Sequence, residues 1–336
     1  MSGPATEVAL VRAAVRRCVA DLPRGSHLLV ACSGGADSLA LAAAASFLAP
    51  REGLPAGGVV VDHGLQPGSA EVAASVRTQL LALGLTPVRI VRVEVGRGGG
   101  PEAAARDARY AALRFVADDV GAAAVLLGHT LDDQAESVLL GLGRGSGARS
   151  LAGMAPVSGL WRRPLLGIPR ETTRAACAAE GLPAWEDPHN ADDSFARVRV
   201  RRDALPALER AVGPGVAAAL ARSARLLRAD ADALDGWAES AWRGLGAGAV
   251  LDAGELAGLP RAVRSRVLRL AATDAGVPPL ALEHVEELDR LVTEWHGQGP
   301  VSLPAGASGR RAGGALLLTP GAVAGAAAVQ DEPRGR

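Results

Sequence analysis

The chain has 336 residues, 49% of them hydrophobic, so it is long enough for two domains with substantial cores. Its 36 basic residues, all arginine, are balanced by 36 acidic ones, so net charge does not single out a nucleic-acid-binding protein. No apolar run reaches the ~20 residues that span a bilayer, and the N-terminus lacks the apolar core of a signal peptide, so the sequence predicts neither a membrane protein nor a secreted one. The three cysteines form no CxxC pair, which argues against a disulfide framework and favours a reducing cytoplasm.

The first predicted strand, 27–32, leads into the loop Ser33-Gly34-Gly35-Ala36-Asp37-Ser38 and an Ala- and Leu-rich helix over 39–48. A strand, a Gly-rich turn and a helix aim backbone N–H groups at one point, which predicts that the loop binds phosphate. Asp37 would repel a triphosphate unless a cation lay between them, so it predicts a Mg²⁺ ligand. The spacing fits neither a Walker A loop nor GxGxxG. An ordinary βα turn of small residues is the alternative.

Further strands are predicted over 58–63, 88–95 and 122–129, with helices over 69–83 and 101–118 between them. Strands alternating with helices indicate an α/β fold with a doubly wound, mostly parallel sheet. Ligands of such sheets bind beyond the carboxyl ends of the strands. Asp62, His63, Gly128 and His129 are therefore expected to line a nucleotide site.

The segment 128–137, after the fourth predicted strand, carries an unusual density of polar residues. Asp132, Asp133 and Glu136 suit a cationic substrate, a metal ion or a general base, and His129 suits donation to a phosphate or leaving group. The plainer alternatives are a helix N-terminal carboxylate for one of the Asp residues and a structural role for His129.

A second, smaller domain is predicted after the Gly-Pro-Gly stretch at 213–215. Helical patterns over 215–245, 260–275 and 281–296 precede a small hairpin built from 300–304 and 315–318. Residues 321–336 show no periodicity and predict a disordered tail. The expected domains are therefore 1–212, 213–320 and the tail.

The Ser33–Ser38 loop resembles the PP-loop of N-type ATP pyrophosphatases, and a set of motifs in order resembles the tRNA(Ile)-lysidine synthetase family. These are DHGL at 62–65, ARDARY at 105–110, HTLDDQAE at 129–136, GRG at 143–145, GM at 153–154, RPLL at 163–166, WEDPHN at 185–190 and RVRVR at 197–201. They cover residues 27–210. The chain departs from the pattern at Gln66, Ser137 and Val198. From its length we expect the additional C-terminal domain of longer members to be missing.

The resemblance implies a PP-loop fold and an enzyme that uses ATP and Mg²⁺. It would adenylate C2 of the wobble cytidine in CAU-anticodon tRNA(Ile), release pyrophosphate, and let the ε-amine of free L-lysine displace AMP. The lysidine formed changes codon reading from AUG to AUA and identity from Met to Ile. The resemblance implies roles for the charged residues of the crevice: Asp37, Arg109, His129, Asp132 and Asp133 in catalysis, and Asp132, Asp133 and Glu136 toward lysine, with the three lysine roles unassigned.

A positive surface for tRNA is predicted between Phe195 and Arg228, because this segment contains eight arginines and only two acidic residues. The predicted tRNA-binding residues are Arg106, Arg144, Arg197, Arg199, Arg201 and Arg202. For Arg222–Arg228 a solvated helical face is an equal alternative.

Three other functions fit the sequence less well. A tRNA thiolase of the same superfamily would use cysteine pairs, a small-molecule ligase such as GMP synthetase would have no use for the 197–202 arginines, and a non-catalytic nucleotide-binding protein would not need His129, Asp132 and Asp133. The sequence leaves the oligomeric state open, a homodimer being one alternative, and leaves open how methionine tRNA is rejected.

Overall fold

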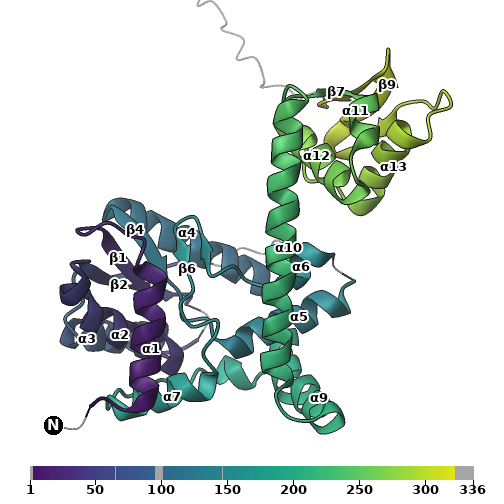
Figure 1. Ribbon diagram of the computed structural model, residues 1–336. Coiled ribbons are helices and arrows are strands. Elements are labelled where there is room, and N and C mark those ends of the chain that lie inside the picture. Colours follow the sequence, from purple (N-terminus) through teal and green to yellow (C-terminus); the bar gives the residue numbers. More distant parts are fainter. Residues whose placement is uncertain (1–2, 65, 95–100, 146, 322–336) are drawn as a thin grey trace, which may run out of the picture. The chain divides into compact units, whose positions relative to one another are not determined.

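The computed structural model describes residues 3–64, 66–94, 101–145 and 147–321 (Figure 1). The chain divides into two compact units, unit 1 from Met1 to Arg228 and unit 2 from Ala229 to Arg336. The division falls inside helix α10 (Val216–Gly244), later than the expected boundary after Val212. The Gly-Pro-Gly stretch instead separates α9 (Leu205–Val212) from α10, because Gly213 and Gly215 take φ values of 98° and 94° that end a helix.

Unit 1 is built on a sheet whose described strands have the order β3-β2-β1-β4-β6-β5. β1 to β4 and β6 run parallel, and β5 runs antiparallel to β6. The strands are β1 (His27–Ala31), β2 (Ala56–Asp62), β3 (Val88–Arg92), β4 (Ala122–Leu126), β5 (Val157–Ser158) and β6 (Trp161–Arg162). The predicted doubly wound, mostly parallel sheet is confirmed. The pair β5–β6 was not predicted, because two-residue strands carry no periodicity.

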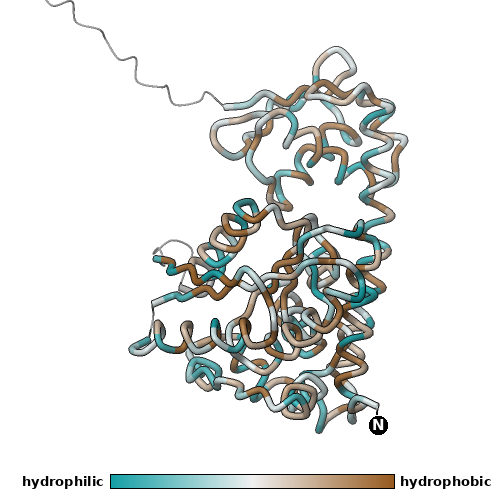
Figure 2. Tube along the Cα trace, turned by 90° about the vertical axis from the view of Figure 1, so that its left-hand side faces the viewer, coloured by the Kyte–Doolittle hydropathy of each residue, from teal (hydrophilic) through white to brown (hydrophobic). Residues whose placement is uncertain are grey.

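Helices cover both faces of this sheet because successive strand residues point to opposite sides. Leu28 and Val30 of β1 pack in one core with α1, α2, α3 and α7, whereas Leu29 packs in a second core against α4. Figure 2 shows the hydrophobic stretches of the strands inside the unit. These helices are α1 (Thr6–Val19), α2 (Ala36–Glu52), α3 (Ser69–Ala82), α4 (Pro101–Asp119) and α7 (Arg170–Ala179).

The strand order reverses between β1 and β4, and at such a point the connections leave for opposite faces and open a crevice. The loop Ser33–Ser38 follows β1, and α5 (Leu131–Gly143) follows β4. The remaining elements of unit 1 are α6 (Ala148–Leu151), the 3₁₀ turn η1 (Pro188–Ala191), α8 (Ala196–Arg199) and the π turn η2 (Val200–Ala204). The arginine-rich run 197–201 is therefore helical.

Unit 2 contains helices packed on an antiparallel sheet whose described strands have the order β7-β10-β9-β8. The elements are β7 (Val250–Asp252), α11 (Ala253–Gly258), α12 (Arg261–Asp274), α13 (Leu282–Thr293), β8 (Val301–Ser302), the short turn η3 (Pro304–Gly306), β9 (Ser308–Ala312) and β10 (Ala315–Thr319). The expected C-terminal hairpin is present as β9 and β10, but its first strand is 308–312 and not 300–304. Residues 308–312 had been expected to form the turn. Gly309 made that segment look like a turn, but it lies in β9, where a Cβ would overlap Leu288.

Within the described residues, no helix combines the length and apolar character needed to cross a membrane. Apart from Gly321, the tail predicted to be disordered lies outside the described residues.

Candidate active site

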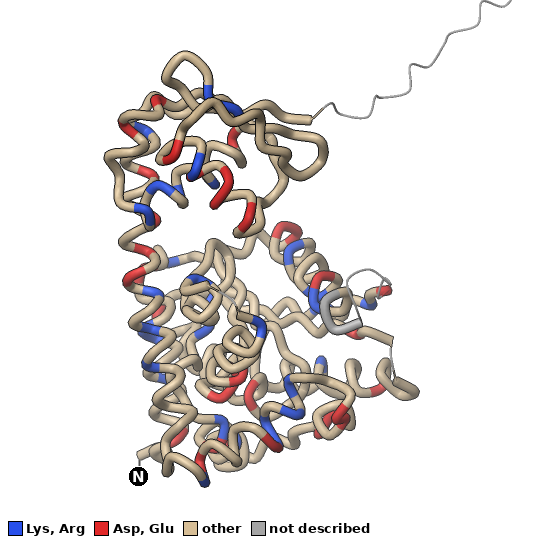
Figure 3. Tube along the Cα trace, turned by 90° about the vertical axis from the view of Figure 1, so that its right-hand side faces the viewer, with Lys and Arg blue, Asp and Glu red and all other residues tan. Residues whose placement is uncertain are grey.

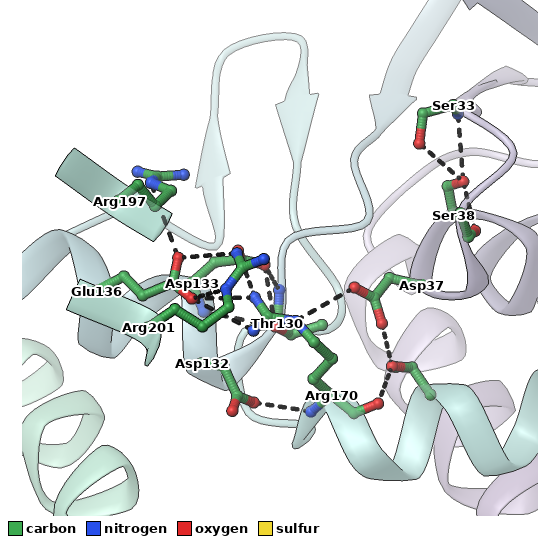
Figure 4. Close-up of polar contacts among 12 residues, drawn as sticks. Ser33, Asp37, Ser38, Thr130, Asp132, Asp133, Glu136, Arg170, Arg197 and Arg201 are labelled. Atoms are coloured by element: carbon green, nitrogen blue, oxygen red, sulfur yellow. Dashed lines mark hydrogen bonds and ion pairs between the residues drawn. The ribbon is translucent and has the colours of Figure 1, made fainter. Parts of the chain in front are cut away.

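The loop after β1 is closed by its two serines. Ser38 Oγ donates to the carbonyl of Gly35 at 2.8 Å and accepts from the backbone N of Ser33 at 3.2 Å (Figure 4). Gly34 has a φ of +86°, and a Cβ there would lie 2.6 Å from Cγ2 of Val76, so this position requires glycine. Among the described residues no side chain caps α2, so its first N–H groups are donors available at the crevice.

The end of β4 lies directly against this loop. A Cβ on Gly128 would be 3.2 Å from Cα of Ser38, so glycine allows the two segments to approach. This contact brings His129 and the first turn of α5 to the same crevice as Asp37. The predicted convergence of the polar residues after β1 and β4 is therefore present in the structure.

Arg170, at the start of α7, lies at the centre of a cluster of acidic side chains (Figure 4). Its Nη2 donates to Oδ1 of Asp133 at 2.8 Å, and its Nη1 to Oε1 of Glu136 at 3.3 Å. Its Nε lies 3.7 Å from Oδ2 of Asp37, and its backbone N donates to Oδ2 of Asp132 at 2.8 Å. One arginine thus joins the carboxylates of α2 and α5.

Glu136 is fully buried, and both of its carboxylate oxygens accept hydrogen bonds from arginine. Its side chain is 0% exposed, and Arg201 donates to both of its oxygens, from Nε at 2.7 Å and from Nη2 at 3.2 Å. Nε of Arg197 lies 3.8 Å from Oε2. A buried carboxylate that accepts hydrogen bonds from this many donors has little capacity left for a substrate.

Asp133 caps the helix on which it lies. Its Oδ2 accepts from the backbone N of Thr130 at 2.8 Å and from the Thr130 hydroxyl at 2.9 Å, which closes a capping box at the start of α5. Burial raises the pKa of Asp133, but Arg170 and these hydrogen bonds outweigh it, so the pKa lies below its usual value.

Asp132 and Asp37 are the less occupied carboxylates. Within the described part of the chain, Oδ1 of Asp132 makes no hydrogen bond. Asp37, on the first turn of α2, accepts a hydrogen bond from the Thr173 hydroxyl, and its side chain is 26% exposed. Burial raises the pKa of Asp37 by more than Thr173 and Arg170 lower it. Asp132 therefore keeps one oxygen atom for a ligand, and Asp37, with one partner at each oxygen, keeps lone pairs on a partly exposed carboxylate.

His129 is held neutral at physiological pH. Burial, followed by the positive charge of Arg109, lowers its pKa to about 3. Its Nδ1 is buried and has no hydrogen-bond partner among the described residues. Burial also lowers the pKa of Arg109, which lies on α4. A neutral imidazole and a guanidinium are thus next to each other at the carboxyl end of β4.

The polar residues at the end of β2, Asp62 and His63, also have shifted pKa values. Burial and the charge of Arg109 lower the pKa of His63, so it too is kept neutral. Asp62 accepts from the backbone N of Gly64 at 2.9 Å; burial raises its pKa, and this hydrogen bond with the other donors around it brings the pKa below the usual value. Asp62 shapes the turn after β2, and His63 lies within electrostatic reach of Arg109.

The arginines predicted to bind tRNA fall into two groups. Arg197 and Arg201 point to the carboxylate cluster, and Arg197 also donates to Oγ of Ser137 at 3.2 Å. The other four are exposed. Arg106 lies beside Tyr110 and Arg144 at the end of α5, whereas Arg199 of α8 and Arg202 of η2 donate to backbone carbonyls of the loop 191–194. Along the traced chain, basic and acidic positions are interspersed in each unit (Figure 3).

Sequence reasoning missed Arg170 and Thr173. In a chain with 36 basic residues, all arginine, nothing local distinguishes the arginine that follows a proline at a helix start. The packing of α7 beside α2 brings both residues to Asp37. Trp185, which was not assigned to the site, donates its backbone N–H to the carbonyl of Gly34 at 2.9 Å and so braces the loop.

No group of three or more His, Cys, Asp or Glu side chains suited to a metal ion occurs within the described residues. Cys32 and Cys177 are buried and Cys18 is half-buried, all as free thiols. Burial raises the pKa of each of these thiols. They have the environment of small core residues.

Comparison with known proteins gives consistent matches along the chain. A family model described as PP-loop domain matches residues 9–208, and one described as TilS substrate binding domain matches residues 251–317. The tRNA(Ile)-lysidine synthase of Thermobifida fusca is 60% identical over 322 residues, covering 95% of this chain and 99% of that protein. The enzyme of the same name from Streptomyces coelicolor is 54% identical over 351 residues, covering 95% and 100%.

A solved structure is similar in fold. The U34-tRNA thiolase NcsA from Methanococcus maripaludis, with its 4Fe-4S cluster, gives a TM-score of 0.55 at 19% identity over 66% of this chain and 80% of that one. At this identity the likeness establishes the architecture of the PP-loop fold and nothing about the reaction.

Proposed function

From the premise that this chain belongs to the tRNA(Ile)-lysidine synthase family, we propose how its residues divide the work of forming lysidine on tRNA(Ile) with ATP. The reaction needs a binding site for pyrophosphate, stabilisation of the negative charge that develops at the α-phosphate, and a carboxylate that binds and deprotonates lysine. Each requirement has a counterpart at the crevice between β1 and β4.

The loop Ser33–Ser38 and the uncapped N-terminus of α2 bind the phosphates that leave as pyrophosphate. Gly34, Gly35 and Ala36 let the backbone approach them closely, and the serine hydroxyls add donors. Asp37 fits Mg²⁺, because this ion is commonly held by one or two carboxylates together with substrate phosphates. When bound, it supplies positive charge between Asp37 and the triphosphate.

Arg109 and His129 act at the α-phosphate. O2 of the wobble cytidine attacks the α-phosphorus, and negative charge accumulates on the equatorial oxygens as pyrophosphate leaves. Arg109 offsets that charge, and the neutral His129 donates one ring N–H. Because its pKa is about 3, His129 serves as a hydrogen-bond donor and not as a cation.

Asp132 takes the ε-amine of lysine. Of the carboxylates on α5, Glu136 is saturated by arginine and Asp133 caps the helix, whereas Oδ1 of Asp132 is open within the described structure. Asp132 binds the ammonium and accepts its proton, the amine nitrogen attacks C2 of the adenylated base, and AMP leaves with the former O2. Glu136 and Asp133 are positioning residues in this scheme.

The observation that carries the proposal is the unequal occupation of the carboxylates around Arg170. Its test is the incorporation of labelled lysine into a CAU-anticodon tRNA(Ile) transcript, with AMP and pyrophosphate measured alongside. Asp132→Asn is expected to raise the KM for lysine at least about tenfold and to leave the KM for ATP unchanged. Asp118→Asn, an exposed change on α4, is the matched control.

Two outcomes would contradict the proposal at different levels. Absence of lysine-dependent incorporation by the wild-type enzyme would remove the function itself. An unchanged KM for lysine in Asp132→Asn, with incorporation intact in the wild type, would remove the role of Asp132 alone.

A further inference from the structure

Unit 1 contains an open pocket of about 390 Å³ beside the carboxylate cluster. It lies between α5 and the part of α10 that belongs to unit 1, two helices seen side by side in Figure 1. Leu131, which borders the pocket, is the chain neighbour of Asp132, the residue proposed to bind lysine. The lining residues are Leu131, Gln134, Met154, Pro156, Leu166, Gly167, Ala218, Ala221, Arg222, Arg225 and Arg228.

One wall of the pocket is apolar and firmly held. Nε2 of Gln134 donates to the backbone carbonyl of Met154 at 3.1 Å, and Oε1 of Gln134 accepts from the Met154 N–H at 2.8 Å. Arg228 donates to the carbonyls of Ala152, at 3.0 Å, and of Gly153. These bonds fix the 152–154 segment, so the surface of Met154, Pro156 and Leu166 is preformed.

The opposite rim carries arginines available for a ligand. Arg222 and Arg225 are exposed, and neither makes a hydrogen bond or ion pair within the described part of the chain. None of the described lining residues is acidic. The pocket therefore combines an apolar wall with uncompensated positive charge, a combination suited to a ligand that is flat and apolar on one side and anionic on the other.

We propose that this pocket holds an unpaired nucleotide of the tRNA anticodon loop next to the modified cytidine, an inference that rests on the proposed function. The base lies on the apolar wall, and Arg222 and Arg225 bind the flanking phosphates. Single-stranded bases splayed out of a loop are recognised by such surfaces, and arginine pairs with phosphate in bidentate fashion. Free lysine fits less well, because these arginines could pair only with its α-carboxylate, and none of the described lining residues is acidic to pair with its two ammonium groups.

The test compares two kinds of variant in the full-length enzyme. Arg222→Gln combined with Arg225→Gln is expected to raise the KM for tRNA by about tenfold for each arginine. It should also reduce the slope of log(kcat/KM) against log[salt] by roughly 0.7 per lost phosphate contact. Ala221→Leu narrows the pocket and is expected to raise the KM for tRNA without changing the salt slope. The KM values for ATP and lysine should stay at wild-type levels.

Arg17→Gln is the matched control, since Arg17 is an exposed arginine of α1, outside both the pocket and the segment predicted to bind tRNA. A KM for tRNA in the double variant equal to that of Arg17→Gln would overturn the proposal. A raised KM for lysine with an unchanged KM for tRNA would assign the pocket to lysine instead. If the wild-type enzyme incorporates no lysine, the proposed function fails, and tRNA binding by fluorescence anisotropy still decides whether the pocket binds RNA.

Discussion

Arg170 determines what the acidic residues after β4 can do. Side chains of like charge this close would repel one another, and one guanidinium bonded to Asp133 and Glu136 and close to Asp37 makes their proximity tolerable. The same contacts separate the roles of adjacent residues. Glu136 and Asp133 are bonded within the protein, whereas Asp132 keeps an oxygen atom without a hydrogen bond among the described residues, and the partly exposed Asp37 keeps lone pairs for a ligand.

Glu136→Gln is expected to destabilise unit 1 by about 1.5–3 kcal/mol, because it replaces a fully buried carboxylate by a neutral amide beside the half-buried Arg201 and Arg170. Asp132→Asn, on the same helix, keeps an oxygen acceptor and is expected to cost less than about 1 kcal/mol. Urea unfolding measures both. Equal destabilisation by the two variants would show that Glu136 has no special structural role.

His129 is expected to stay neutral well below pH 6. Its folded pKa of about 3 lies below the unfolded value of about 6.5, so the unfolded chain binds the proton first as the pH falls. Stability therefore falls between about pH 6.5 and pH 3, by up to roughly 1.4 kcal/mol per pH unit from this residue. An NMR titration of the imidazole C–H signals checks it, and a midpoint near 6.5 would refute the assignment.

At the scale of elements, two helices begin at the same crevice with opposite chemistry. Helix α5 is closed by the Thr130–Asp133 capping box, whereas α2 starts from Gly35 with no side-chain cap among the described residues. The N–H groups of α5 are thus partly satisfied internally, and those of α2 are available to an anion. The fold uses one helix start to position carboxylates and the other to bind phosphate.

Gly34→Ala is expected to disrupt the phosphate loop. Its φ of +86° costs an L-residue about 1–2 kcal/mol, and the added Cβ would lie 2.6 Å from Val76. The KM for ATP should rise at least about tenfold, because the backbone of the loop Ser33–Ser38, which is proposed to bind phosphate, must shift. Gly25→Ala is the control, since Gly25 has the same φ of +86° but lies outside the phosphate loop, with no atom within 4 Å of a new Cβ. Equal KM values for the two variants would contradict this account.

At the scale of the whole molecule, the chain has separate cores in its two units. The core of unit 1 lies on both faces of the parallel sheet, and that of unit 2 lies among α11, α12, α13 and the antiparallel sheet. Stability is then divided between the units, and damage to one core is expected to stay local.

Leu288→Ala is expected to destabilise unit 2 by about 2–5 kcal/mol, because Leu288 on α13 is 0% exposed. Amide hydrogen exchange should accelerate in α12 and α13 and stay unchanged in β1 and β4. Leu282→Ala on the same helix, where the side chain is 63% exposed, should have little effect. Faster exchange in β1 would show that the two units unfold together.

The sequence by itself determined the features that local patterns encode. Apolar runs 27–32 and 122–129 predicted β1 and β4, and the strand–turn–helix order predicted the phosphate loop. The motifs from DHGL to RVRVR predicted the family and hence the reaction. Helix α10 was predicted almost to the residue, because helical periodicity over so long a stretch is unambiguous.

The tertiary structure decided what depends on contacts between distant segments. Arg201 and Glu136 are 65 residues apart, and Arg170 and Glu136 are 34 apart, so no periodicity joins them. The roles of Asp132 and Asp133 could not be separated from sequence, because adjacent carboxylates differ only in what packs against them. The strand order and the pocket beside α10 likewise follow from packing, which burial and side-chain geometry fix and composition does not.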